Sequence, residues 1–378
     1  MTARLLHLID PGSSSWPALA LLSDLLARPP RRVEHESVII GGLRAEHAAS
    51  AAGIRVSDRI APTLSRPFLA SRTFRRLLSS RRVPDAIVAW SVPSAVLAHQ
   101  AAGHLPVVTV LTLPPPPFIG ASQWTFAARA IRKSALIVYP SAFLRDSWVA
   151  RFTLLGCPAA VIPPDPVAPL THDADRLALR REWGIDDGAT VIMPMGEPVG
   201  AIDAHAAVFA AGVLGVAGHH AVVLVPPQAA RLDRALRFAS RIRPSRRVIV
   251  DDRPPFALLP GCDLALWFEP ESESTGHSGS AYTTPLGAVS LAWADAMGIP
   301  IVAHDHPAWR SVVGESPRCV PVYGRTRHPL TRAILQAIEH ASNEARAEQT
   351  RPTEWANRFD ARVLSLLHER ARTLAASR

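Results

Sequence analysis

Short apolar runs alternate with longer segments of helical character from one end of the 378-residue chain to the other. Several runs are continuously apolar, as is typical of parallel strands that are covered on both faces of a sheet. Regular alternation of strands and helices favours an α/β fold with parallel sheets. In the first half of the chain the pattern predicts strands at 5–9, 37–40, 86–89, 107–111 and 136–139, and helices at 17–28, 68–80, 94–102, 121–133 and 142–151.

A proline-rich stretch divides this pattern in two. The prolines of residues 160–169, AVIPPDPVAP, exclude a helix and would stiffen a link between domains. After this link the pattern predicts helices at 173–183, 203–216, 229–241, 255–259, 286–297, 329–341 and 353–372, and strands at 190–194, 221–225, 247–250, 264–268, 299–303 and 319–322.

The alternation therefore predicts two doubly wound, Rossmann-like parallel-sheet domains that face a cleft. We expect an N-terminal domain at 1–163, a C-terminal domain at 170–350 and a final helix within 351–378. Ligands of such sheets bind beyond the carboxyl ends of the strands, which is where the candidate residues are sought.

Composition narrows the classes of function. Hydrophobic residues make up 48% of the chain, which is enough for sizeable cores. The N-terminal apolar stretch ends at Asp10 and is typical of a strand rather than a signal peptide, and no apolar run reaches the length of a membrane span. We therefore expect a cytoplasmic protein. Its three widely spaced cysteines fit neither a disulfide framework nor a zinc site, and the sequence predicts no metal and no cofactor.

The net charge of +9 raises the question of an anionic partner. Lys133 is the only lysine and alanine is abundant, so the excess of arginine is typical of a coding bias. The basic clusters at 72–76, 81–82 and 241–247 are interpreted first as solvated helix ends or loops, and peripheral contact with an anionic membrane stays open. We expect no specific nucleic-acid partner, because aromatic residues are not interleaved with the basic ones.

Four stretches carry a family resemblance. They are RLLHLIDPGSSSWPALALLSDLLA, SALIVYPSAFLRDSWVARF, VIPPDPVAPLTHDADRLALRREWGIDDGATVIMPMGEP, and CDLALWFEPES with PLGAVSLAWADAMGIPIVAHDHPAW. In this order they resemble the group 1 (glycogen-synthase-like, retaining) glycosyltransferases of GT-B fold. The resemblance implies a nucleotide-diphosphate sugar donor held by the C-terminal domain, and a final helix that packs back toward the N-terminal domain.

The charged residues of that family's donor site are replaced in this chain. In the register set by Gly298 and Pro300, Trp293 stands where an acid would accept hydrogen bonds from the ribose. Glu197 stands where an arginine would contact the diphosphate, and a carboxylate there would repel it. The histidine that often follows the fifth strand is missing from 109–113.

The remaining candidates for donor binding are backbone groups and small polar side chains. The turn at 10–15 offers hydroxyls, and the start of the predicted helix 286–297 offers free N–H groups and a positive dipole end. A threonine just before that helix caps it or lines the site. The predicted donor-binding residues are Gly12, Ser13, Ser14, Glu271, Thr283, Gly287, Ala288 and Trp293.

Two further polar segments leave alternatives open. Residues 269–280, which include Glu271, form a solvated loop or supply new acids beyond a strand end. His304 and His306 are metal ligands or simply face solvent. No catalytic residue is predicted.

These observations lead to three hypotheses. The first is a glycosyltransferase that moves a sugar from a nucleotide-diphosphate donor to a glycan or lipid-linked acceptor. The second is a catalytically inactive GT-B protein that serves as a binding or scaffold partner in a surface-polysaccharide pathway. The third is an arginine-rich binder of anionic surfaces or nucleic acid, whose affinity would fall steeply with salt.

Overall fold

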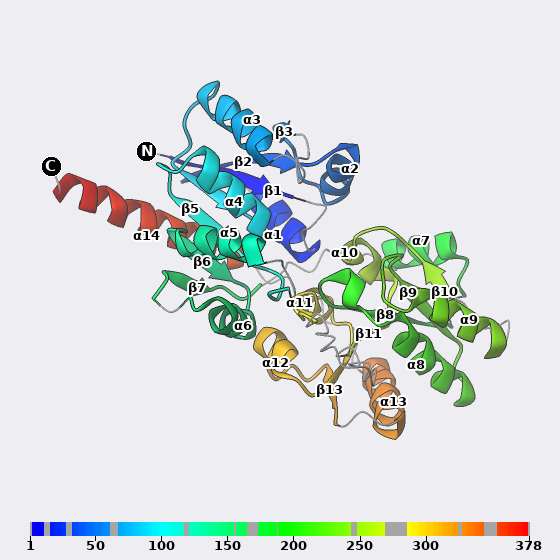
Figure 1. The fold of residues 1–378 in the computed structure, drawn as a ribbon. Helices are drawn as coiled ribbons and strands as arrows, with labels where there is room; N and C mark the ends of the chain where they lie inside the picture. The colour runs from blue at the N-terminus through cyan, green and yellow to red at the C-terminus, as the bar shows by residue number, and fades with distance from the viewer. Residues whose placement is uncertain are drawn as a thin grey trace. The chain divides into compact units, whose positions relative to one another are not determined.

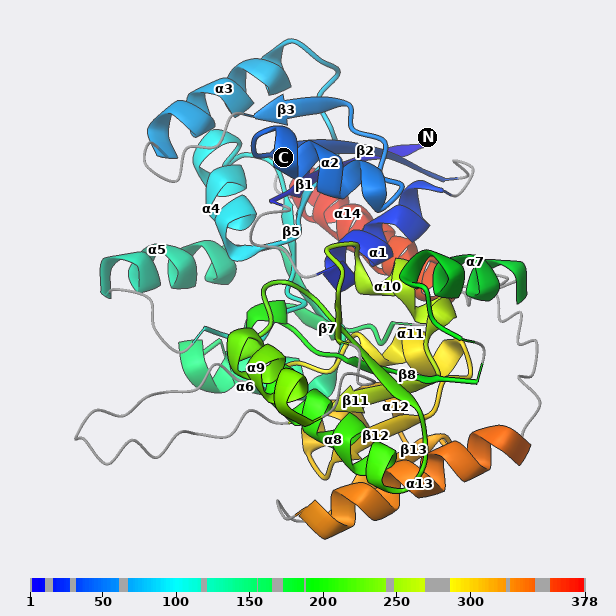
Figure 2. The same cartoon turned by 90° about the vertical axis from the view of Figure 1, so that its right-hand side faces the viewer.

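A computed structural model of the chain describes residues 2–10, 16–27, 32–60, 67–116, 121–154, 156–164, 173–186, 188–242, 248–268, 286–323, 327–343 and 354–376. The chain divides into two compact units, drawn as ribbons in Figures 1 and 2. Unit 1 comprises Met1–Pro164 and Thr353–Arg378, and unit 2 comprises Asp165–Pro352. The C-terminal helix therefore belongs to the same unit as the N-terminal strands.

Unit 1 is built on a seven-stranded sheet of order β3-β2-β1-β4-β5-β6-β7, in which the strand pairs are parallel. Its strands are β1 (Ala3–Ile9), β2 (Val33–Ile40), β3 (Asp58–Ile60), β4 (Ala86–Ala89), β5 (Val107–Val110), β6 (Leu136–Tyr139) and β7 (Ala159–Val161). The order reverses between β1 and β4, as it does in doubly wound folds.

Helices cover both faces of this sheet. Because crossovers between parallel strands are right-handed, α1 and α2 lie on one face and α3 to α6 on the other, which can be followed in Figure 2. The helices are α1 (Trp16–Leu26), α2 (Leu43–Ala51), α3 (Pro67–Ser79), α4 (Val92–Ala101), α5 (Ala121–Arg132) and α6 (Ala142–Phe152). Serines start two of them: the Ser91 hydroxyl accepts from the Ser94 N–H, and that of Ser141 from the Leu144 N–H.

The last helix, α14 (Glu354–Ala376), is held to unit 1 by aromatic contacts. Trp355 and Phe359 are buried and their rings stack at 5.2 Å between centroids. Both rings pack against Trp90, at the end of β4. The Trp355 indole N–H also donates to the carbonyl of Ile162 at 3.0 Å. The first turns of α14 are thus fixed to the edge where β4 and β7 finish.

Unit 2 is built on a six-stranded parallel sheet of order β10-β9-β8-β11-β12-β13. Its strands are β8 (Thr190–Pro194), β9 (Ala221–Val225), β10 (Val248–Val250), β11 (Leu264–Trp267), β12 (Ile301–His304) and β13 (Cys319–Val322). Its helices are α7 (Asp173–Trp183), α8 (Ala204–Val216), α9 (Leu232–Ile242), α10 (Pro255–Leu258), α11 (Leu291–Ala296), α12 (Pro307–Val313) and α13 (Arg327–Asn343). The central strands β9 and β11 are buried along their whole length.

The predicted fold class is confirmed, because both units are parallel sheets with helices around them. Some elements differ from the prediction. Residues 160 and 161 of the predicted link belong to β7, and α2, β3 and α12 were not predicted. Of these, β3 has only three residues and α2 has little hydrophobic bias, so neither leaves a strong sequence pattern.

Among the described residues, no helix combines the length and apolar character that crossing a bilayer requires.

Candidate functional site

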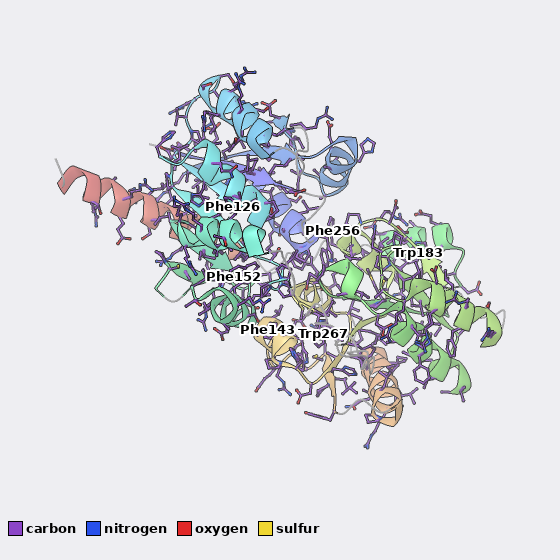
Figure 3. The ribbon with its side chains drawn as sticks, in the orientation of Figure 1. Phe126, Phe143, Phe152, Trp183, Phe256 and Trp267 are labelled. Carbon is purple, nitrogen blue, oxygen red and sulfur yellow. The ribbon has the colours of Figure 1, made fainter. Side chains whose placement is uncertain are left out.

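The carboxyl edge of the second sheet brings the ends of β8 and β11 against the segment 286–290. Beyond β8, Glu197 forms an antiparallel bridge with Gly287. The Gly287 N–H donates to the Glu197 carbonyl at 2.6 Å, and the Glu197 N–H donates to the Gly287 carbonyl at 3.3 Å. The same Gly287 carbonyl accepts from the indole N–H of Trp267 at 2.9 Å; Trp267 is marked in Figure 3. Three segments far apart in sequence are therefore joined at this edge.

Gly196 allows this close approach. Its φ is +143°, and a Cβ atom at this position would lie 2.6 Å from Cγ of Leu286. A larger residue would push the end of β8 away from the 286–290 segment. The glycine is thus required by both the backbone conformation and the packing.

The Glu197 side chain points into the interior of this junction, and the residue is fully buried. Its Oε1 atom accepts a hydrogen bond from the backbone N–H of Ser290, whereas Oε2 has no hydrogen-bond partner among the described residues. The Ser290 hydroxyl is also buried without a partner in the described part of the chain. Burial raises the pKa of Glu197 to about 7, and hydrogen bonds from Ser290 and Val289 oppose that rise. The carboxyl group is therefore poised between its neutral and charged forms near neutral pH.

The start of the predicted helix 286–297 is wrong. Helix α11 begins at Leu291, because residues 286–287 run alongside Glu197 as an extended segment and 289–290 form a turn. The N–H group of Gly287 is consequently not free, since it donates to Glu197. Ala288 follows the bridge and is 2% exposed. Donor binding by Gly287 and Ala288 stays a prediction, but these residues are not at the N-terminus of a helix, because α11 begins at Leu291.

Trp293 lies within α11, where it is 5% exposed. An indole in this position packs in the interior of unit 2, so little of its surface is accessible for stacking on a ligand. Its predicted place in the donor site stays a prediction.

His304 and His306 lie at the carboxyl end of β12 and each has a local role. The His306 ring accepts from the Ala308 N–H, which starts α12, and packs 5.4 Å from the Trp267 ring. The His304 ring packs 4.8 Å from that of Phe268. Asp305, between them, pairs with Arg310. Within the ranges that the structure describes, no three His, Cys, Asp or Glu side chains are grouped as metal ligands would be.

The other predicted donor-binding residues, which are Gly12, Ser13, Ser14, Glu271 and Thr283, lie outside the described residues. The polar segment 269–280 lies outside them as well. The predicted donor-binding residues that the structure describes are therefore Gly287, Ala288 and Trp293, which lie in or just after the segment 286–290 that contacts Glu197.

Unit 1 contains a buried chain of polar side chains that no sequence pattern indicated. The Trp90 indole N–H donates to Nδ1 of His7 at 3.0 Å, so His7 must carry its own proton on Nε2. That nitrogen lies 2.9 Å from Nδ1 of His35, whose Nε2 faces Asp360 of α14 at 3.6 Å. Burial, together with the neighbouring His35, keeps the pKa of His7 well below its usual value. His7 is therefore a neutral structural link that donates its Nε2 proton to the hydrogen bond with His35. The only sequence signal was a histidine inside an apolar strand.

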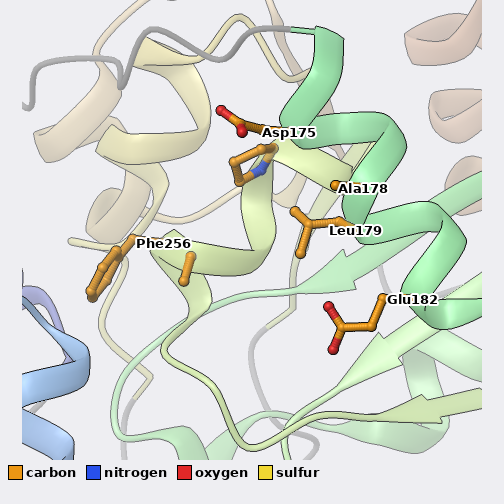
Figure 4. A pocket seen from close by; sticks show the side chains of 7 residues that line it. Asp175, Ala178, Leu179, Glu182 and Phe256 are labelled. Atoms are coloured by element: carbon orange, nitrogen blue, oxygen red, sulfur yellow. The ribbon is translucent and has the colours of Figure 1, made fainter.

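A pocket of about 430 Å³ lies elsewhere in unit 2, between α7 and α10 (Figure 4). Asp175 and Glu182 of α7 line it together with Leu179 and Phe256. None of the predicted donor-binding residues contributes to it, and its two carboxylates would repel a diphosphate. This pocket is not a suitable donor site.

Comparison with solved structures places this arrangement among known folds. HepE (Alr3699) from Anabaena in complex with UDP and glucose superposes with a TM-score of 0.62 at 16% identity, over 98% of this chain and 99% of that one. A glycosyltransferase from Rickettsia africae superposes with a TM-score of 0.59 at 12% identity, over 97% of this chain and 94% of that one. A Listeria monocytogenes protein described as a UDP-N-acetylglucosamine 2-epimerase gives 0.60 at 12%, over 98% and 97%.

The chain has the GT-B fold. The superpositions extend along nearly the whole chain, so both Rossmann-like units take part in the likeness. No protein-family model matches the sequence, and no curated protein matches it either. At these levels of identity the likeness establishes the architecture, and activity has to be argued from the residues.

Proposed function

We propose that the chain is a GT-B glycosyltransferase that takes a sugar from a nucleotide-diphosphate donor and passes it to a glycan or lipid-linked acceptor. The group 1 resemblance of its sequence motifs favours transfer with retention of anomeric configuration. The proposal places the donor at the carboxyl edge of the second sheet, near Gly287, Ala288 and Trp293. It keeps the expectation from the sequence that Gly12, Ser13, Ser14, Glu271 and Thr283 also take part in donor binding. No residue is assigned a catalytic role.

One observation carries this proposal. The architecture matches that of HepE over 98% of the chain, and HepE structures contain UDP, UDP with glucose, and UDP-glucose. GT-B architecture is also shared with a protein described as an epimerase, whose named substrate is a UDP-sugar. The common chemistry is recognition of a nucleotide-diphosphate sugar, and this supports such a donor for the present chain.

A second candidate is a GT-B protein that binds a partner or a sugar nucleotide without transferring the sugar. Glu197 favours this candidate. It stands where the group 1 resemblance places a cation for the diphosphate, and it is buried with a pKa of about 7. Above that pH the junction carries a negative charge, which repels a diphosphate placed at the same edge.

The decisive experiment separates binding from transfer. We would titrate the chain with UDP, UDP-glucose, a GDP-sugar and an ADP-sugar and follow the melting temperature, because a ligand stabilises the state that it binds. Release of free nucleotide diphosphate from the same sugars, with and without added glycan acceptors, then measures turnover. Transfer requires both signals, and a shift without release supports a protein that binds a sugar nucleotide without transferring the sugar. The absence of any shift at millimolar concentration refutes donor recognition, and with it the proposed transfer.

Glu197→Gln sharpens this experiment. The substitution removes the negative charge and keeps the hydrogen-bond acceptor for Ser290. If a diphosphate binds at this edge, the variant should bind it several-fold more tightly at pH 8, with little change at pH 5. Glu315→Gln, an exposed position elsewhere in unit 2, is the matched control for a change of one charge.

Cytoplasmic localisation stays a prediction from the sequence. Peripheral contact with an anionic membrane is also a proposal.

A further inference from the structure

The positive charge of the chain is concentrated in one segment of unit 1. Residues 67–133 contain eight Arg or Lys residues and a single acidic residue, Asp85. Their net charge of +7 compares with +9 for all 378 residues. Six of the eight cations lie on α3 or α5 or directly after α5, and these helices lie on the same face of the first sheet. Most of the excess charge of this segment is therefore on one side of unit 1.

The outer surfaces of α3 and α5 carry the exposed members of this set. Helix α4 packs between α3 and α5, as Figure 1 shows, and half of its own residues are buried. On α3, Arg72 and Arg76 are exposed and lie four residues apart, on one side of the helix. On α5, Phe126 (marked in Figure 3), Arg129 and the following Lys133 are exposed at spacings of three and four, so they form one stripe. We call these five residues the α3–α5 face.

Within the described ranges, the side chains of the four cations of this face donate no hydrogen bond to the fold. Neighbouring arginines do: Arg75 donates to the carbonyls of Gln100 and Ala101, and Arg132 donates to that of Phe152. For the four cations of the α3–α5 face, by contrast, no described carboxylate lies within ion-pair distance. Their charge is available to an external anion.

Phe126 adds an apolar group to the same surface. Its side chain is 59% exposed, on the same stripe as Arg129 and Lys133. An exposed aromatic ring beside arginine and lysine is the composition that suits the interface of an anionic bilayer, where the ring enters the headgroup layer and the cations contact phosphates. A binder of single-stranded nucleic acid needs a series of aromatic platforms, and the described part of this face offers one.

We propose that the α3–α5 face docks unit 1 on an anionic lipid surface, with Arg72, Arg76, Arg129 and Lys133 at the lipid phosphates and Phe126 in the interface. This surface is separate from the donor edge of unit 2, and the inference goes beyond the proposed transfer reaction because it does not depend on nucleotide binding.

The test is co-sedimentation of the full chain with vesicles. We would compare phosphatidylcholine vesicles with vesicles that also contain phosphatidylglycerol, at about 50 and about 300 mM salt. The chain should bind the anionic vesicles and bind them less tightly at the higher salt concentration. It should not bind vesicles of phosphatidylcholine alone. Each juxtamembrane cation contributes about fivefold to binding, so Arg72→Glu/Arg76→Glu and Arg129→Glu/Lys133→Glu should each reduce binding at least about 25-fold.

Two further variants separate location from net charge. Arg234→Glu/Arg237→Glu changes the net charge equally, at exposed positions of α9 in unit 2, and should leave vesicle binding unchanged. Phe126→Ser should weaken binding several-fold without altering its dependence on salt. Melting temperatures of all variants should stay within a few degrees of the parent chain, since the positions are exposed.

Three outcomes would overturn the proposal. One is equal loss of binding in the α9 control, which would make net charge the cause. Another is absence of binding to anionic vesicles. The last is selective binding of single-stranded or duplex RNA through these residues with no vesicle binding, which would identify nucleic acid as the partner. Loss of donor binding in the variants is not expected, so failure here and failure of the proposed function are distinguishable.

Discussion

Replacing Glu197 with glutamine removes a titrating group from the interior of unit 2 and keeps its shape. In the folded chain the pKa of Glu197 is about 7, because burial penalises the charged form. In an unfolded chain a glutamate has a pKa of about 4.3. Between these values the folded state binds more protons than the unfolded state, so stability falls as pH rises through this window. Between about pH 4.5 and pH 8 this ionisation lowers the free energy of unfolding by roughly 3 kcal/mol.

Glutamine does not ionise, so the stability of the variant does not fall with pH in this way. Its side-chain carbonyl still accepts from the Ser290 N–H, and its amide lies near the Ser290 hydroxyl, which has no partner in the described structure. We expect Glu197→Gln to match the parent chain near pH 4.5 and to exceed it by roughly 3 kcal/mol at pH 8.

The assay is urea unfolding followed by tryptophan fluorescence at several pH values between 4.5 and 8. Unit 2 contains Trp267 and Trp293 near the junction, which report its unfolding. Glu315→Gln, at an exposed position, should show no such pH-dependent gain. A stability difference that stays constant across this pH range, or a variant less stable than the parent chain at pH 8, would show that Glu197 does not titrate with a raised pKa in the folded chain.

Two other substitutions test the packing of each unit by thermal or urea unfolding. Gly196→Ala should lower the free energy of unfolding by about 2–4 kcal/mol, because its Cβ would collide with Leu286 at a φ of +143°. Gly188→Ala, which has open space around it, should be nearly neutral. Equal effects of the two substitutions would contradict the close approach of Gly196 to Leu286. Trp90→Phe keeps a ring against Phe359 but leaves Nδ1 of buried His7 without its donor, so we expect a loss of about 1–3 kcal/mol. A neutral Trp90→Phe would show that the buried chain of polar side chains does not form.

The sequence was sufficient to predict the architecture because the signals for it are local. Continuous apolar runs such as 136–139 and 221–225 identify buried strands, and the helices between them repeat with regular spacing. The final helix was predicted at 353–372 and is observed as α14 (Glu354–Ala376). Short elements such as β3 and β7, with three residues each, carry too little pattern to be predicted.

The candidate site was harder to predict because its contacts join distant segments. Residues 286–290, LGAVS, have a composition compatible with a helix, but the bridge to Glu197, some 90 residues away, holds 286–287 in an extended conformation. The sequence showed that Glu197 replaces a cation, and it could not show that this carboxylate is buried against Ser290. Likewise His7 meets Trp90, 83 positions along the chain, only through sheet pairing.

Recognition of a nucleotide-diphosphate sugar can be measured by equilibrium titration of the chain with UDP-sugars, GDP-sugars and ADP-sugars. We expect saturable binding of at least one of these donors, tighter in Glu197→Gln than in the parent chain at pH 8 and unchanged in Glu315→Gln. No detectable binding of any donor at millimolar concentration, by either the parent chain or Glu197→Gln, would contradict it.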